Sequence, residues 1–261
     1  MKAFILDKYA RDAALRLGEL PNPVLTETGV LVEIHAAGLN PLDHKIRDGE
    51  FKLILPLKPP FALGSDLAGV VKAVGPKVTN FAPGDEVYAR VDAQTIGTLA
   101  EYFVVDQADC ALKPASLSMD EAASAPLVAL TAWQALFDTA GVKAGDKVFI
   151  QAGSGGVGVY AIQLARHAGA FVATTAGASS ADLLKGLGAD RVIDYRTEDF
   201  GTILDAYDVV LHSQGAPELM KSLRILKPGG KVVSISGPPD PAFGEAIGAN
   251  WAVRQVMRLM S

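Results

Sequence analysis

Hydrophobic and polar residues follow two different patterns along this 261-residue chain. Up to about residue 115, apolar residues form short runs, several of which alternate with polar residues, and glycine and proline separate them. Alternation with a period of two is typical of half-buried strands. The pattern therefore predicts a compact, mostly antiparallel β-rich domain over residues 1–117. The clearest runs are AFIL (3–6), VLVEIHAAG (30–38), AGVVKAVG (68–75), DEVYAR (85–90) and LAEYFVVD (99–106).

After Pro114 the pattern changes, because apolar strands now alternate with helical stretches. This order is typical of right-handed βαβ units that build a parallel sheet. We expect a doubly wound (Rossmann) domain over residues 118–261, so the fold class of the chain is α/β with a β-rich domain first. The expected strands are KVFIQ (147–151), FVATT (171–175), RVID (191–194), DVVLHS (208–213) and KVVSIS (231–236).

Three helical segments carry further expectations. Ser118 is placed to cap a helix that begins with MDEAASA, and residues 127–137 predict a largely buried helix with Trp133 in the core. The last segment, residues 241–261, predicts a loop and a strongly apolar helix. Since a helix after the fifth strand usually leads to a sixth strand in this fold, we expect the sheet edge to be incomplete.

A glycine-rich turn joins the first strand of the second half to a helix. It has the spacing G-x-G-x-x-G, which in this context indicates a dinucleotide site. The first glycine permits the tight turn, the second lets the backbone approach a pyrophosphate, and the third lets the helix pack on the strand. The pyrophosphate would then lie at the positive end of the helix. The expected contacts are Gly153, Ser154, Gly155, Gly156, Val157 and Gly158.

The loop after FVATT indicates which dinucleotide binds. NAD sites commonly use a carboxylate there to hold the ribose 2′-hydroxyl, but residues 176–180 (AGASS) contain none. Ser179 and Ser180 can instead donate hydrogen bonds to a 2′-phosphate, with Tyr195 and Arg196 as partners. We therefore expect NADPH (NADP) as the cofactor. An alternative interpretation is that the two serines only cap the next helix.

Composition excludes several classes of function. A net charge of −5 gives no basic surface for nucleic acid, and no apolar run is long enough to cross a membrane. Four histidines and one cysteine, Cys110, argue against a disulfide framework and a zinc cluster. The start of the chain is too briefly apolar for a signal peptide, so we expect a cytoplasmic protein.

Three motifs in order resemble those of the medium-chain dehydrogenase/reductase superfamily. GSDLAGVVKAVGPKVTNFAPGDEVYA (64–89) is similar to its GroES-like domain motif, and NPLDHKIRDG (40–49) to a stretch of its quinone reductases. GDKVFIQAGSGGVGVYAIQLAR (145–166) is similar to the nucleotide motif. Within the superfamily the resemblance is strongest to the zinc-free quinone oxidoreductase and alkenal/enone reductase branch.

The resemblance implies an NADPH-dependent, zinc-independent enzyme that transfers hydride to a quinone or an α,β-unsaturated carbonyl. Zinc ligands of the related alcohol dehydrogenases match Asn40, Ser65 and Leu127, which cannot supply thiolate or imidazole, so no metal is expected. Asn40 and Lys45 are the expected donors to the substrate oxygen, and Asp43 orients its neighbours.

The resemblance also extends the cofactor site. The threonine of the LTAW helix, here Thr131, lies near the phosphates or the nicotinamide in relatives. Ser213, Ser236 and Gly237 end two strands at the carboxyl edge of the sheet, where doubly wound folds bind ligands. Full-length members are expected to be homodimers through a sixth strand, which this sequence does not reach, so we do not expect the dimer for this chain.

Two other functions stay open. Ser154 stands near the position of a nucleophile elbow, and Asp208 and His212 follow in the order of a serine hydrolase triad. Against this, Ala152 replaces the elbow's first glycine, and Asp208 and His212 lie on one predicted strand. The second alternative is an NADP-binding protein or inactive fragment that catalyses no reaction.

Overall fold

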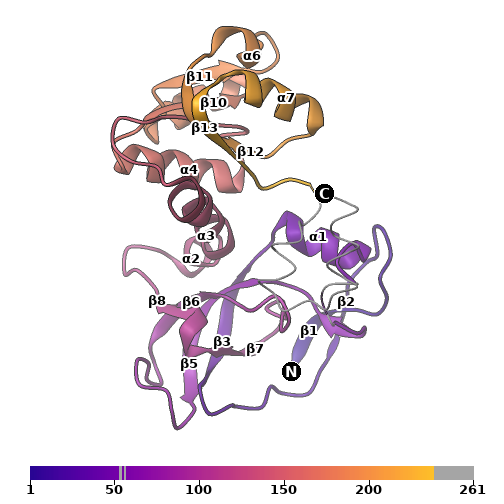
Figure 1. Ribbon diagram of the computed structural model, residues 1–261. Coiled ribbons are helices and arrows are strands. Elements are labelled where there is room, and N and C mark those ends of the chain that lie inside the picture. Colours follow the sequence, from indigo (N-terminus) through magenta and orange to yellow (C-terminus); the bar gives the residue numbers. More distant parts are fainter. Residues whose placement is uncertain (53–54, 56, 238–261) are drawn as a thin grey trace. The chain divides into compact units, whose positions relative to one another are not determined.

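The computed structural model describes residues 1–52, 55 and 57–237 (Figure 1). The chain divides into two compact units, Met1–Leu127 and Val128–Ser261. The loop and apolar helix predicted over residues 241–261 lie outside the described residues. In the part of the chain that is described, no helix is both long and apolar enough to span a membrane.

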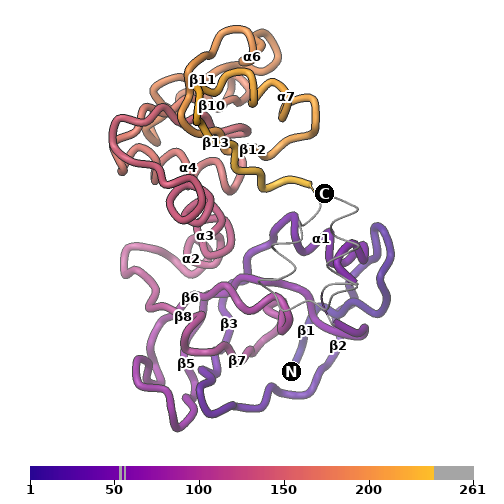
Figure 2. Tube along the Cα trace, viewed as in Figure 1, coloured from indigo at the N-terminus to yellow at the C-terminus, as the bar shows by residue number. Residues whose placement is uncertain are grey.

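The first unit is built from two antiparallel sheets, whose strands can be followed along the trace in Figure 2. One sheet has the order β7-β3-β5-β6-β8, and the other has the order β2-β1-β4. Apolar residues of both sheets, among them Leu6, Val32 and Leu67, form one core cluster. The strands are β1 (Lys2–Leu6), β2 (Arg16–Glu19), β3 (Gly29–Gly38), β4 (Phe61–Ala62), β5 (Asp66–Val74), β6 (Glu86–Arg90), β7 (Tyr102–Asp106) and β8 (Cys110–Leu112).

Helix α1 (Pro41–Asp48) interrupts these strands, although the sequence pattern predicted no helix there. Its ends nonetheless have ordinary signals. Pro41 occupies the first helical position, where its missing N–H costs nothing, and Asp43 lies in the first turn. Gly49 ends the helix with a left-handed φ of 84°. Eight residues are too few for the apolar period to stand out, so only the end signals could have located this helix.

Helix α2 (Met119–Ala123) begins as predicted, since the Ser118 hydroxyl accepts a hydrogen bond from the Glu121 backbone N–H at 3.2 Å. Ala122 and Ala123 pack with Ala68 of β5 in a small core cluster. These contacts join α2 to the β-rich unit. The division between units therefore falls after Leu127, ten residues beyond the expected boundary at residue 117.

The second unit contains a five-stranded parallel sheet with the order β11-β10-β9-β12-β13. Read along the chain, this is strand order 3-2-1-4-5 of a doubly wound fold, and the order reverses between β9 and β12. The strands are β9 (Lys147–Ile150), β10 (Phe171–Ala176), β11 (Arg191–Asp194), β12 (Tyr207–His212) and β13 (Leu226–Ser234). The helices are α3 (Pro126–Trp133), which begins in the first unit, the π-helix η2 (Gln134–Ala140), α4 (Gly156–His167), the 3₁₀ turn η3 (Ala178–Ser180), α5 (Ala181–Gly186), α6 (Phe200–Ile203) and α7 (Ala216–Arg224).

Both faces of this sheet are buried, as its continuous apolar strands require. On β9, Val148 and Ile150 join the core cluster shared with α4 and η2, whereas Phe149 between them packs with Phe200 of α6 on the other face. The Trp133 prediction was wrong, because its side chain is 50% exposed and lies against Phe137 with the ring centroids 4.7 Å apart and the rings tilted. Its helix is apolar on most sides, so periodicity could not show which side faces the core.

Candidate functional site

A buried polar cluster surrounds Asn40 in the first unit. Asn40 is the N-cap of α1, and its backbone N–H donates to the Asp43 carboxylate at 2.8 Å. Its side-chain amide donates to Asp66 at the start of β5, at 2.9 Å. Ser65 donates to the other oxygen of Asp43 at 3.0 Å. Asp43 in the first turn of α1 thus holds the Asn40 backbone, and Asp66 at the start of a central strand holds its carboxamide.

The two carboxylates of this cluster are perturbed by the same cause. Asp66 is fully buried, and burial raises its pKa to about 7, with the neighbouring charge of Asp43 adding to the shift. Burial also raises the pKa of Asp43, which hydrogen bonds from Asn40 and Ser65 oppose. Water is excluded from both groups, so their ionised forms depend on these neutral donors. Sequence reasoning missed Asp66, although an aspartate inside an apolar strand was a usable signal.

The remaining candidates of α1 lie at its surface. Lys45 and His44 are exposed, whereas Asp43 in the first turn of α1 is buried. The Lys45 side chain therefore lies at the surface of the first unit. The structure brings Asn40 and Asp43 together but leaves Lys45 outside their hydrogen-bonded cluster.

The glycine turn of the second unit follows β9 directly, and its first and third glycines are forced by close packing. A Cβ at Gly153 would collide with the Oγ1 of Thr174 on β10. A Cβ at Gly158 would collide with the Ala152 carbonyl and lie 2.7 Å from the Gly153 Cα. The positive φ in the turn belongs to Ala152, at 52°, rather than to Gly153. Gly153 is thus needed for space against β10 and not for its own dihedral angle.

The middle of the turn is open to solvent. Gly155 is the N-cap of α4, and the exposed residues Ser154, Gly155 and Gly156 lie around it, followed by the half-buried Val157. Among the described residues, a Cβ at Gly155 would have only the Ala152 carbonyl within 4 Å, at 3.2 Å. The first backbone N–H groups of an α-helix have no acceptor within the helix, so this end can bind an anion. The arrangement fits a pyrophosphate.

The loop after β10 lies beside the end of β11. A Cβ at Gly177 would be 4.0 Å from the guanidinium carbon of Arg196, and that guanidinium stacks 5.6 Å from the centre of the Tyr195 ring. Ser179 is exposed, and Ser180 makes no side-chain capping bond to α5. The interpretation that the serines only cap this helix thus has no bond to support it. The loop 176–180 and the Arg196 guanidinium together form an exposed group of hydrogen-bond donors.

Hydrogen bonds join the ends of β9, β12 and β13. The Ser213 N–H donates to the side-chain carbonyl of buried Gln151 at 3.2 Å, and the Gln151 amide donates to Ser222 of α7 at 3.0 Å. The Ser236 hydroxyl donates to the Gln214 carbonyl at 2.6 Å, and Gly237 follows with a φ of 104°. Gln151, which sequence reasoning did not select, therefore connects the strand ends at the point where strand order reverses. A buried glutamine just before the glycine turn was the available signal.

Thr131 and the residues of the serine hydrolase alternative all belong to the second unit. Thr131 is half-buried on α3, in the same unit as the glycine turn. The hydrolase alternative fails on geometry, because Asp208 is the second residue of β12 and His212 its last, about 13 Å apart at the usual strand rise. Asp208 instead accepts from the Lys147 N–H and pairs with Lys227. It cannot orient His212 toward Ser154.

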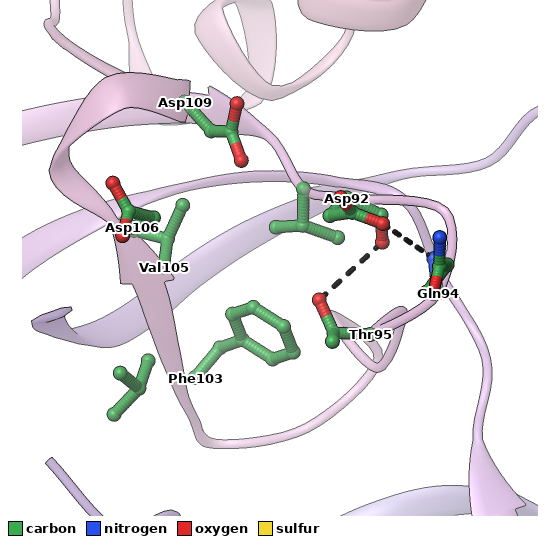
Figure 3. A pocket seen from close by; sticks show the side chains of 9 residues that line it. Asp92, Gln94, Thr95, Phe103, Val105, Asp106 and Asp109 are labelled. Atoms are coloured by element: carbon green, nitrogen blue, oxygen red, sulfur yellow. Dashed lines mark hydrogen bonds between the residues drawn. The ribbon is translucent and has the colours of Figure 1, made fainter. Parts of the chain in front are cut away.

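A separate hollow of about 420 Å³ lies in the first unit, between β7 and the loop after β6 (Figure 3). Three carboxylates, Asp92, Asp106 and Asp109, line it beside Phe103. Asp92 accepts from the Gln94 N–H at 2.7 Å, and Asp106 accepts from the Thr28 hydroxyl. Among the described residues, no three His, Cys, Asp or Glu side chains are arranged to hold a metal ion. We assign no function to this hollow.

Comparison with known proteins matches both units. Residues 26–115 fit the family model described as alcohol dehydrogenase GroES-like domain, and residues 156–256 fit the one described as zinc-binding dehydrogenase. The structure of the quinone oxidoreductase from Coxiella burnetii aligns with a TM-score of 0.83 at 36% identity, over 95% of this chain and 79% of that one. This chain belongs to the medium-chain dehydrogenase/reductase superfamily. The predicted fold, a GroES-like domain followed by a Rossmann domain, is confirmed.

Two curated relatives place the chain in the quinone oxidoreductase and alkenal/enone reductase branch of this superfamily. The 2-methylene-furan-3-one reductase of Solanum lycopersicum is 40% identical over 253 residues, covering 92% of this chain and 63% of the relative. The chloroplastic NADPH-dependent alkenal/one oxidoreductase of Arabidopsis thaliana is 39% identical, covering 92% and 64%. The chain spans just under two thirds of the length of both relatives.

The second family model is described as a zinc-binding dehydrogenase. Whether this chain can bind zinc depends on the side chains at the ligand positions. At the positions that the family resemblance matches to zinc ligands, this chain has an amide, a hydroxyl and an alkyl side chain, from Asn40, Ser65 and Leu127. Asn40 and Ser65 already donate to buried carboxylates, and the Leu127 backbone N–H donates to Asp66 at 3.0 Å. Zinc requires thiolate, imidazole or free carboxylate ligands. This donor set does not fit zinc.

Proposed function

We propose that this protein is an NADPH-dependent oxidoreductase that transfers hydride to a quinone or an α,β-unsaturated carbonyl without a metal. The observation that carries the proposal is the glycine turn 153–158, which meets the N-terminus of α4 where the strand order of a parallel sheet reverses. Dinucleotides bind at this position in doubly wound folds. The names of the relatives, which include an alkenal/one oxidoreductase and a quinone oxidoreductase, support the class of reaction.

The phosphate end of the cofactor is assigned to the second unit. Backbone N–H groups of residues 153–158 would hold the pyrophosphate, and Thr131, Ser213, Ser236 and Gly237 would line the rest of the site. Arg196 beside Gly177 supports a 2′-phosphate, because guanidinium groups bind phosphate strongly and the loop 176–180 has no carboxylate to repel it. Ser179, Ser180 and Tyr195 would complete this subsite.

The first unit would supply the groups that act on the substrate. NADPH, when bound, supplies the hydride, and the acceptor then carries negative charge on its oxygen. The Asn40 side-chain amide donates one N–H to Asp66 and makes a weaker hydrogen bond with Asp43, and its second N–H would turn from Asp43 to the substrate oxygen. Lys45 would add positive charge near the same oxygen, and Asp43 would hold the helix cap in place. No step of this reaction needs a Lewis acid, in agreement with the side chains of Asn40, Ser65 and Leu127, which do not suit zinc.

The decisive experiment follows oxidation of NADPH and NADH at 340 nm with quinones, enals, enones and simple aldehydes, with and without a chelator. We expect turnover of a quinone or an enone, faster with NADPH and unchanged by the chelator. Faster use of NADH would refute the cofactor assignment, and loss of activity on chelation would refute metal independence. NADPH binding without turnover of any acceptor would favour the non-catalytic alternative instead.

The cytoplasmic placement of the protein is also a proposal. The absence of a long apolar helix from the described residues agrees with it, but the Arabidopsis relative is named as chloroplastic. Fractionation of the source cells, followed by immunodetection, tests the placement.

A further inference from the structure

Asp66 is the centre of the polar cluster rather than a peripheral member of it. One carboxylate oxygen accepts from the Asn40 side-chain amide at 2.9 Å, and the other accepts from the Leu127 N–H at 3.0 Å. Asn40 caps α1, and Leu127 lies in the first turn of α3. A single side chain on β5 therefore joins the starts of two helices.

The neighbouring strand makes room for this carboxylate. Gly38 at the end of β3 pairs with Asp66 in the sheet register. A Cβ at Gly38 would lie 3.3 Å from an Asp66 oxygen and would collide with the Ala123 carbonyl of α2. Only glycine leaves both α2 and the carboxylate in place. The site is thus shaped around Asp66 by four elements besides its own: α1, α2, α3 and β3.

The charges that face Asp66 are few. On α1 the ionisable neighbour is Asp43, whose negative charge opposes ionisation of Asp66, and β6 contributes Arg90, whose positive charge favours it. The neighbours from β3, α2 and α3 are Gly38, the Ala123 carbonyl and the Leu127 N–H, which carry no net charge. Asp66 therefore ionises against burial with the help of two N–H donors and the positive charge of Arg90, its partner in the sheet register.

We propose that Asp66 is a positioning residue for the reduction: its ionised carboxylate fixes the Asn40 carboxamide so that the second amide N–H is directed to the substrate oxygen. This proposal rests on the proposed function. An ionised carboxylate accepts hydrogen bonds at both oxygens, as Asn40 and Leu127 require. Protonation places a hydrogen on one oxygen, opposite an N–H that is also a donor, and one of the two bonds is lost. The Asn40 amide is then free to turn.

The sign of the pH effect follows from this geometry. Because burial raises the pKa of Asp66 to about 7, the positioning form predominates above pH 7 and disappears below it. We expect kcat to rise with pH through this range. In Asp66→Asn the side chain has one acceptor where the carboxylate had two, so kcat at pH 8 should fall at least about tenfold, and the rise near pH 7 should vanish.

The experiment measures kcat and KM from pH 6 to pH 9 for the wild type, Asp66→Asn and the control Asp106→Asn, which changes an exposed carboxylate of the same unit. KM for NADPH should stay within about twofold in Asp66→Asn, since the proposed cofactor residues belong to the other unit. Wild-type kcat and an unchanged pH profile in Asp66→Asn would overturn the proposal. A wild type that turns over no acceptor would instead refute the proposed function.

A second readout does not need activity. In a ¹⁵N-labelled protein, the side-chain amide signals of Asn40, assigned with Asn40→Ala, should shift with pH with a midpoint near 7 in the wild type and in Asp106→Asn. In Asp66→Asn this titration should be absent. If the Asn40 signals titrate identically in all three proteins, Asp66 does not position Asn40. The spectra also report whether each variant is folded.

Discussion

Asp43 and Asp66 are carboxylates that the β-rich unit buries with neutral hydrogen-bond donors around them. Ser65, the Asn40 backbone and side chain, and the Leu127 N–H compensate part of the lost hydration. Burial still outweighs them, since the pKa of both groups is raised. A structural role alone would be served better by neutral residues. The cluster therefore costs stability at neutral pH, as expected for a site whose order serves function.

The pH dependence of the free energy of unfolding should show the cost of burying the Asp66 carboxylate directly. The pKa of Asp66 is about 7 in the folded state and near 3.8 in the unfolded chain, so the folded state binds more protons between these values. The free energy of unfolding therefore falls as pH rises from 4 to 7. Relative to wild type, Asp66→Asn should gain about 3 kcal/mol between pH 5 and pH 8. Urea unfolding at both pH values measures the gain, and parallel pH dependence of the two proteins would contradict it.

Substitution of Arg196 tests whether the protein prefers NADPH to NADH. Because its guanidinium lies beside the loop after β10, Arg196→Ala should remove a charge-assisted hydrogen bond to the 2′-phosphate. KM for NADPH should rise about tenfold or more, whereas KM for NADH should not change. Arg191→Ala, at the opposite end of β11, is the matched control. Equal changes of KM for both cofactors would show that Arg196 does not bind the 2′-phosphate.

At the scale of elements, the contact between the glycine turn and α4 decides whether the proposed cofactor site exists. The turn and the helix touch so closely that Gly158 has no room for a side chain, and Gly153 meets β10 in the same way. The rim formed by Gln151, Ser213 and Ser236 continues this edge along the ends of three strands. The proposed cofactor site therefore depends more on how the turn, α4 and the strand ends are placed than on any single hydrogen-bond donor.

Gly158→Ala should therefore damage both stability and binding. Its Cβ would collide with backbone of the turn, which cannot move away as a flexible side chain could. We expect a loss of about 1–3 kcal/mol from overpacking and a large loss of NADPH affinity. Gly186→Ala is the control, because α5 has open space there and the exchange should be neutral or stabilising by up to about 1 kcal/mol. Similar effects of the two exchanges would refute this packing argument.

On the scale of the whole molecule, the two roles are assigned to different compact units. Met1–Leu127 contains Asn40, Asp43 and Lys45, and Val128–Ser261 contains every residue proposed to bind the cofactor. This division allows binding and chemistry to be tested separately. A variant of the polar cluster should retain cofactor affinity, and a variant of the glycine turn should lose it.

Cofactor binding should stabilise the folded protein by mass action. At a concentration about 100 times its Kd, NADPH should add about 2.7 kcal/mol and raise the Tm by several degrees. NADH at the same concentration should give a smaller shift. Differential scanning fluorimetry measures both, and Gly158→Ala should show no shift with either. A Tm that does not respond to NADPH would refute binding, whether or not the protein is an enzyme.

The sequence by itself determined the long strands, the glycine turn and the superfamily, because each depends on local pattern. Alternating residues mark the strands of the β-rich unit, and a turn with three spaced glycines is specific enough to be read without coordinates. The same holds for the Ser118 cap. Short α1 was missed since eight residues show too little periodicity, and Trp133 was misplaced since its helix is apolar on most sides.

Only the tertiary structure decided which polar residues act together. Asn40, Asp66 and Leu127 lie far apart in sequence, and their hydrogen bonds exist because α1, β5 and α3 begin at one place in the fold. Likewise Arg196 comes close to Gly177 only through the parallel pairing of β10 with β11. Burial raises the pKa of Asp66, and burial is a property of the packed chain, not of local sequence.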